Sequence, residues 1–101
     1  MSDVVLVTGS VTARKDTIVE MTRVALEHVR RSRTEPGCLS HEVAIDAENP
    51  LRLVFAERWS DAAALKTHFA VPESRAFWRR LQELAADQGG MAVYEATKIR
   101  V

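Results

Sequence analysis

Two histidines and a tryptophan are the side chains of this sequence best suited to proton transfer next to an aromatic molecule. An unperturbed imidazole titrates near neutral pH, so His68 or, less readily, His41 could accept a proton from a phenol or quinol. His68 follows Trp59 by nine residues and lies on a predicted helix, within one turn of Leu65 and Phe69. The same pattern fits a half-exposed histidine at the edge of that helix. The sequence leaves both interpretations of His68 open.

Aromatic side chains near these positions could line a small-molecule cavity, which is usually apolar with a few polar groups. Phe55 and Trp59 share a face of a predicted strand, and a place in the core is the alternative for both. Arg79 could pair with a substrate oxyanion, although arginines on amphipathic helices are more often exposed. The catalytic candidates are His68 and Trp59, and the substrate-binding candidates are His41, Phe55, Phe69, Phe77 and Arg79.

No motif for a metal or an organic cofactor is present. The three histidines and the single cysteine, at positions 28, 38, 41 and 68, show no metal-ligand spacing. Neither a nucleophile elbow nor a dinucleotide fingerprint occurs. We therefore expect no metal, flavin, haem or nicotinamide. His28 is predicted to be a boundary residue of its helix, and Cys38 a small buried hydrophobic residue.

Residues 35–59, EPGCLSHEVAIDAENPLRLVFAERW, predict a β-hairpin that stands at the centre of the chain. Its strands are expected at Cys38–Asp46 and Leu51–Ser60, joined by a turn over residues 47–50. Side chains alternate along both strands, and the odd-numbered residues form the more apolar face. That face should meet the helices.

The hairpin is flanked by helical and strand patterns that complete the order β-α-β-β-α-α-β. The expected elements are a strand Asp3–Val11 covered on both faces, a helix Arg14–Arg33 with a Thr17/Glu20 capping box, a helix Asp61–Ala70 capped by Ser60, a helix Glu73–Asp87 and a strand Met91–Val101. This order predicts an α+β, ferredoxin-like split βαβ sandwich, an antiparallel sheet with helices on one face. Because the other face needs cover, we infer a homodimer.

Several short motifs in this order resemble one known family. They are EPGC at 35–38, an alternating strand that ends at Asp46, ERW at 57–59, an Ala/Leu-rich helix with His68 and a proline before Phe77. Together they resemble the antibiotic biosynthesis monooxygenase family, in particular its quinol-monooxygenase-like members. The resemblance covers nearly the whole chain. It implies one domain over residues 1–101, a dimeric α/β barrel, and a pocket position for Trp59.

The resemblance also implies a cofactor-independent monooxygenase that deprotonates a small aromatic quinol, phenol or anthrone-like substrate, which then reacts with dioxygen. Two features depart from the family. Members that act on polyketide anthrones carry an asparagine where this chain has Phe55, and haem-degrading relatives use an asparagine on the first strand. The one asparagine here is Asn49, so haem degradation is not expected. The alternatives are a non-catalytic small-molecule-binding or stress-response protein and an isomerase or lyase that acts without oxygen.

Composition restricts the partners and the location. Lys and Arg number 14 and Asp and Glu also 14, and this balance speaks against nucleic acid as the main ligand. No apolar run approaches the length of a membrane span and no signal peptide is recognised, so no membrane association is expected. With a single cysteine, we expect a cytoplasmic protein in a reducing compartment.

Overall fold

The computed structural model describes residues 4–101. Its elements are β1 (Val4–Thr12), α1 (Ile18–Ser32), β2 (Cys38–Asp46), β3 (Asn49–Trp59), α2 (Ala62–Ala70), α3 (Pro72–Leu84) and β4 (Gly90–Ala96). The strands form an antiparallel sheet in the order β2-β3-β1-β4. This architecture confirms the predicted α+β, ferredoxin-like fold.

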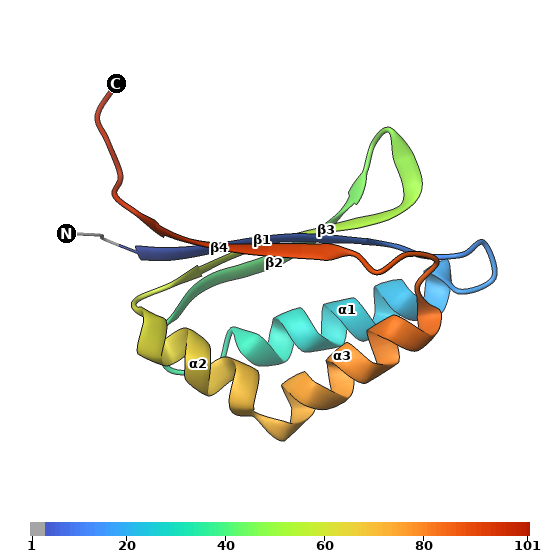
Figure 1. Ribbon diagram of the computed structural model, residues 1–101, viewed down its shortest axis with the longest axis horizontal. Coiled ribbons are helices and arrows are strands. Elements are labelled where there is room, and N and C mark those ends of the chain that lie inside the picture. The colour runs from blue at the N-terminus through green and yellow to red at the C-terminus, as the bar shows by residue number, and fades with distance from the viewer. Residues whose placement is uncertain (1–3) are drawn as a thin grey trace.

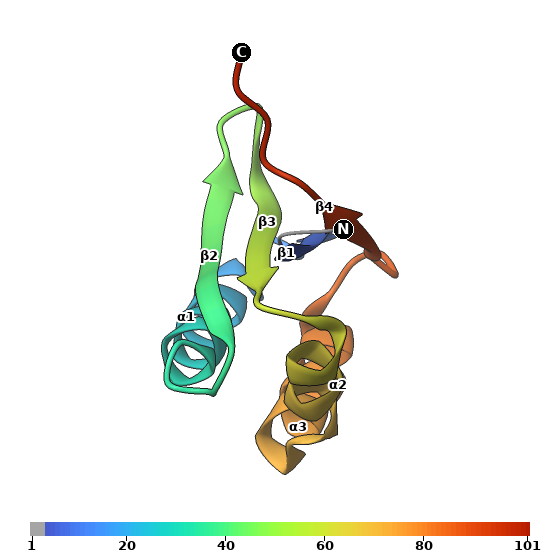
Figure 2. The same cartoon turned by 90° about the vertical axis from the view of Figure 1, so that its left-hand side faces the viewer.

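All helices of the described chain lie on one face of the sheet, and the opposite face is left without a helical layer (Figure 1). Figure 2 shows α1 beneath β2 and, to its right, α2 overlapping α3. On β1, Val5 and Val7 point to the helices and are buried, whereas Leu6 is partly exposed and Thr8 is exposed. The prediction that this strand is covered on both faces is therefore wrong for the single chain, and its residue Asp3 lies outside the described part.

The core lies between the sheet and the helices in two adjoining clusters. In the larger one, α1 contributes the predicted stripe of Met21, Ala25 and Val29, which packs against α3 and β3. The smaller one joins the first strand to α2 and consists of Val5, Val7, Trp59 and Leu65. Both clusters thus lie between the sheet and the helices, where the sequence predicts a small-molecule cavity.

The first helix begins later than predicted, and its start is stabilised by tertiary contacts. Thr17 accepts a hydrogen bond from the backbone N–H of Arg14 at 2.9 Å and donates one to the carbonyl of Leu84 at 2.6 Å. Thr17 makes no side-chain cap to α1, and Glu20 pairs with Arg23 instead. The predicted capping box is therefore wrong, because the hydroxyl is used to tie α1 to the end of α3.

Other element ends also differ from the predictions. Asp61, not Ser60, caps α2, through a hydrogen bond from the backbone N–H of Ala64 at 2.8 Å. Helix α3 already ends at Leu84 and strand β4 at Ala96. Within residues 4–101, the last pair between β1 and β4 is Val4 with Ala96.

The hairpin turn is tighter than predicted. Asp46 pairs with Asn49, so the turn consists of residues 47–48 and Pro50 lies within β3. The register shifts between Cys38 and Ser40, where Leu39 forms a bulge and is 49% exposed. Ile45, next to the turn, is 52% exposed. The odd-numbered face meets the helices only from His41 to Val43 on β2 and from Leu53 to Trp59 on β3.

Candidate active site

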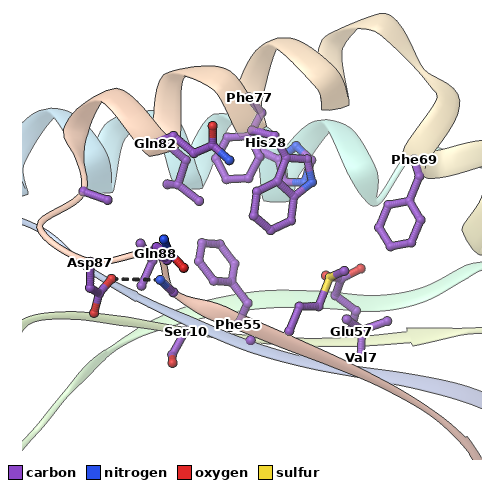
Figure 3. Close-up of a pocket in the computed structure, with 18 of the residues that line it drawn as sticks. Val7, Ser10, His28, Phe55, Glu57, Phe69, Phe77, Gln82, Asp87 and Gln88 are labelled. Carbon is purple, nitrogen blue, oxygen red and sulfur yellow. Dashed lines mark hydrogen bonds between the residues drawn. The ribbon is translucent and has the colours of Figure 1, made fainter.

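A cavity of about 150 Å³ lies between the sheet and the helices. Figure 3 shows Phe77 on the helix side opposite Phe55 and Glu57 on the sheet side. Exposed Gln82 and Gln88 lie at one end, where the cavity opens. An apolar cavity of this size in another protein accommodates a benzene ring. The space therefore suits one aromatic ring.

The structure brings most of the predicted site residues to this cavity. Its lining includes His41, Phe55, His68, Phe69 and Phe77. Arg79 is not among the lining residues and is exposed on α3, which contradicts its predicted contact with substrate. Phe77, two residues earlier, occupies the inward-facing position on that helix, and positions two apart on a helix point to different sides.

Trp59 does not line the cavity either, although we expected it to shape a pocket. Its side chain is 0% exposed and packs in the smaller core cluster. The indole N–H donates to Oε1 of Glu57 at 2.9 Å, and the indole and the ring of His68 lie 4.7 Å apart. Trp59 is therefore a supporting residue behind His68 and Glu57.

His68 is fixed by a carboxylate. Its Nδ1 lies 2.7 Å from Oε1 of Glu35, and the imidazole is 2% exposed. The alternative of a half-exposed histidine is therefore wrong. With Nδ1–H donating to Glu35, the lone pair of the neutral ring is on Nε2, the atom that can accept a proton from a molecule in the cavity.

Glu57 is a second buried carboxylate at the inner part of the cavity. Its Oε1 lies 3.2 Å from Nε2 of His41, in a geometry that is not a hydrogen bond. Burial alone would raise the pKa of Glu57, but the contacts from His41 and the indole N–H of Trp59 outweigh it and hold the pKa below its usual value. Glu57 is therefore ionised at neutral pH.

His28 is part of the site, contrary to its predicted place at the helix boundary. It is 4% exposed and its ring stacks on Phe77, with centroids 3.9 Å apart and planes at 6°. Nη2 of Arg31 donates to Nδ1 of His28 at 3.0 Å and to Ser74 at 3.2 Å. Burial, together with repulsion from the other two imidazoles and Arg31, lowers the pKa of His28 to about 2, so this ring stays neutral.

Sequence reasoning missed the carboxylates and the arginine of this site. Glu57 could have been found, because an acid between Phe55 and Trp59 on the buried face of a strand needs a polar partner. Glu35 stands in a turn motif, and nothing local shows that it meets His68. Arg31 stands in the basic last turn of α1, and nothing local in the sequence shows that it contacts His28.

Cys38 lies near these carboxylates but has no nucleophilic role that the structure supports. The thiol is partly buried, and burial together with Glu57 and Glu35 raises its pKa. A thiol in this environment is mainly protonated at neutral pH. Cys38 stands at the start of β2 as predicted, but it is only partly buried rather than buried.

Comparison with known proteins identifies the family of this chain. The model of the antibiotic biosynthesis monooxygenase family matches residues 4–80. The chain belongs to this family. This match confirms the resemblance noted in the sequence. Membership of the family does not by itself define the reaction that a member catalyses.

Among curated proteins, an uncharacterised protein of Synechocystis is 28% identical over 93 residues. The match takes in 92% of this chain but only 63% of that relative, so the chain spans less than two thirds of its length.

Solved structures share the fold. A candidate antibiotic biosynthesis monooxygenase from Deinococcus radiodurans is 24% identical with a TM-score of 0.90 over 96% of each chain. A protein from Mycobacterium tuberculosis is 21% identical with a TM-score of 0.88, over 97% of this chain and 99% of its own. A conserved protein from Methanosarcina mazei is 19% identical with a TM-score of 0.88 over 93% of each chain.

In residues 4–101, the helices are all too short or too polar to cross a membrane.

Proposed function

We propose that this protein is a monooxygenase for a single-ring quinol or phenol, with His68 as the general base. The pairing of His68 with Glu35 beside an aromatic-lined cavity carries the proposal. The cavity of about 150 Å³ favours one ring over the three fused rings of an anthrone. This geometry supports a base that is oriented before substrate arrives.

The proposed reaction requires dioxygen and no further electron donor. Nε2 of His68 takes a proton from the quinol hydroxyl, and the resulting anion gives one electron to dioxygen. The semiquinone and superoxide combine to form a carbon–oxygen bond, and the peroxide then loses water. A dihydroxybenzene and one dioxygen give a hydroxyquinone and one water, so the substrate supplies all four electrons. His68 returns its proton to the departing oxygen.

In this reaction the protein orients the substrate and removes water from around it. Phe55 and Phe77 contact each other edge to face at the cavity wall, with ring centroids 6.2 Å apart and planes at 70°, and they exclude water from the substrate anion. Removing water strengthens the interaction between the anion and any donor nearby. His28, which stays neutral with its proton on Nε2, is one such donor at the cavity wall.

Oxygen consumption with a panel of dihydroxybenzenes tests this function. We expect turnover by the unmodified protein and a loss of roughly 10²-fold or more in kcat for His68→Gln. Arg79→Gln, at an exposed position outside the cavity, is the matched control and should keep full activity. Equal turnover by all three proteins would contradict the assignment of the base.

A non-catalytic small-molecule-binding protein is the second candidate. It is favoured by the burial of the candidate bases, because His68 and His41 are only 2% and 1% exposed. Saturable binding of a quinol without oxygen uptake would support this candidate. Product formation under strictly anaerobic conditions would point instead to an isomerase or lyase.

We further propose that the protein acts as a homodimer in the cytoplasm. The helix-free face of the sheet carries alternating small and apolar side chains on three neighbouring strands, namely Leu6, Val54, Ala56, Ala92, Tyr94 and Ala96. A second sheet laid over this face would form the barrel that the family resemblance implies. Burial of this face would then stabilise both chains.

A further inference from the structure

Three imidazoles converge at the inner wall of the cavity from elements far apart in the sequence. His28 comes from α1, His41 from β2 and His68 from α2, and all three are buried. Each offers one ring nitrogen, and these nitrogens all lie within 4.8 Å of one another. They are the only histidines of the 101-residue chain. Such clustering is unusual for a residue type that repels its own kind when protonated.

His41 is only partly satisfied for a buried polar side chain. It is 1% exposed, its Nε2 lies 3.2 Å from Oε1 of Glu57 in a geometry that is not a hydrogen bond, and its Nδ1 makes no hydrogen bond in residues 4–101. A buried polar group left in this state costs stability. A cation bound to one ring nitrogen would remove this cost.

Carboxylates stand next to two of the three rings. Glu35 and Glu57 contact His68 and His41 respectively, whereas Arg31 donates to His28 and Arg33 donates to the backbone carbonyl of His41 at 2.9 Å. With neutral imidazoles these two acids and two arginines carry no net charge. Carboxylates behind ligating histidines are a recurring second layer of metal sites, since they orient the ring and raise its basicity.

We propose that His28, His41 and His68 bind one first-row divalent cation of the kind that prefers imidazole, such as Zn²⁺ or Co²⁺. Zinc takes nitrogen ligands at about 2.0–2.1 Å in tetrahedral geometry, which sets them about 3.3–3.4 Å apart. The three ring nitrogens, within 4.8 Å of one another, must therefore move closer together by up to about 1.4 Å around the ion. The fourth position faces the cavity, which all three rings line. Mg²⁺ and Ca²⁺ prefer oxygen ligands and would not compete for the three rings.

One contact must change for His28 to join the ligand set. Arg31 now donates to Nδ1 of His28 and must release it. A new partner is available, because Nε of Arg31 and Oε2 of Glu35 lie 3.8 Å apart and are both buried without a hydrogen bond. Moving Arg31 toward Glu35 would satisfy both atoms. Arg31 is therefore predicted to oppose metal binding.

This site goes beyond the proposed function and competes with it. The ion and the substrate proton need the same atom, Nε2 of His68, because Nδ1 is bound to Glu35. The metal-free protein would carry out proton abstraction, and the metal-loaded protein would lack the base. Zn²⁺ should therefore inhibit oxygen uptake with a quinol, and a chelator should restore it.

Titration of chelator-treated protein with Co²⁺, followed by visible absorption, tests the site without any assay of activity. We expect one ion per chain, a spectrum of low coordination number, and displacement by Zn²⁺ but not by Mg²⁺. Glu35→Gln should weaken binding roughly 10- to 100-fold. His41→Ala should abolish the spectrum, and Cys38→Ser should leave it unchanged, which separates the histidines from the thiol. Retention of the spectrum in His41→Ala would overturn the proposal.

Arg31→Met gives an independent check if His41→Ala does not fold. Loss of this positive charge should make Co²⁺ bind several-fold more tightly, whereas a purely structural role of Arg31 predicts equal or weaker binding. Absence of any saturable Co²⁺ or Zn²⁺ binding to the folded protein would also overturn the proposal. Because these measurements do not involve a quinol, their outcome is independent of the oxygenase assay.

Discussion

Nδ1 of His68 and Oε1 of Glu35 lie 2.7 Å apart, although 33 residues separate them in the sequence. Glu35 belongs to the turn before β2, and His68 to the last turn of α2. This contact fixes which nitrogen of His68 faces substrate, and it joins the turn before the hairpin to the helix that follows the hairpin.

Glu35→Gln tests whether the carboxylate positions the base. The amide keeps the size of the side chain but loses its charge, so it stabilises the protonated form of His68 less well. We expect kcat to fall about tenfold or more with KM nearly unchanged, because a charged hydrogen bond is worth about 1.5–3 kcal/mol. The pH profile of kcat should shift as well. If Glu35→Gln lowers the free energy of unfolding but leaves the pH profile of kcat unchanged, Glu35 has only a structural role.

Trp59→Ala should destabilise the fold, since the indole is fully buried and packs behind His68. The expected cost is about 3–5 kcal/mol, and the indole donor to Glu57 is lost with it. Trp78→Ala is the matched control, because Trp78 is 37% exposed and should cost much less. Urea unfolding of both variants measures the difference. Similar losses for the two would contradict the placement of Trp59 in the core.

The stability of the metal-free protein should fall as the pH drops below about 6.5. His28 has a pKa of about 2 in the folded state against an ordinary value of 6.5, so between these values the unfolded chain binds a proton that the folded chain refuses. Linkage then lowers the free energy of unfolding by up to about 1.4 kcal/mol per pH unit. Urea unfolding at several pH values, with chelator present, measures this slope.

His28→Gln is the control for that slope, because glutamine does not titrate. Its stability should depend less on pH between about 6.5 and 5, a range above the ordinary pKa of carboxyl groups. If the variant keeps the full slope of the unmodified protein, His28 is not its source.

Val54→Glu should break the proposed dimer. It places a charge on the helix-free sheet face, where a second chain would bury it without a partner, at a cost of several kcal/mol. Val19→Glu is the control, since Val19 is 83% exposed on α1. Sedimentation should show a dimer for the unmodified protein and Val19→Glu, and a monomer for Val54→Glu. A monomeric unmodified protein would exclude the dimer and the barrel.

The fold and the cavity walls could be predicted from local patterns. Alternation along residues 38–59 put Phe55, Glu57 and His41 on the face that meets the helices, because successive side chains of a strand point to opposite sides. On α3, Phe77 and Leu81 are four residues apart and share the buried side, as helical spacing requires. Such rules act within one element, so the sequence alone indicated much of the face that meets the interlayer space.

The ends of helices and strands were less predictable, because polar groups that could form local caps also bond to residues distant in the sequence. Thr17 has the sequence signature of a helix cap, yet its hydroxyl bonds the carbonyl of Leu84, 67 residues away. Leu39 fits the alternation of β2, yet a bulge turns it outward.

The site itself was decided by the packing of separate elements. His28, His41 and His68 have no spacing that marks a ligand set, because each stands on a different helix or strand and the sequence distances between them reflect only the lengths of the intervening elements. The same holds for Glu35 and His68. The sequence offered His68 and His41 as candidates for proton chemistry, with a half-exposed place for His68 as the alternative. Only the docking of α1 and α2 on the sheet brought a third imidazole, two carboxylates and Arg31 to them, since burial in one shared space forces such polar groups to find each other.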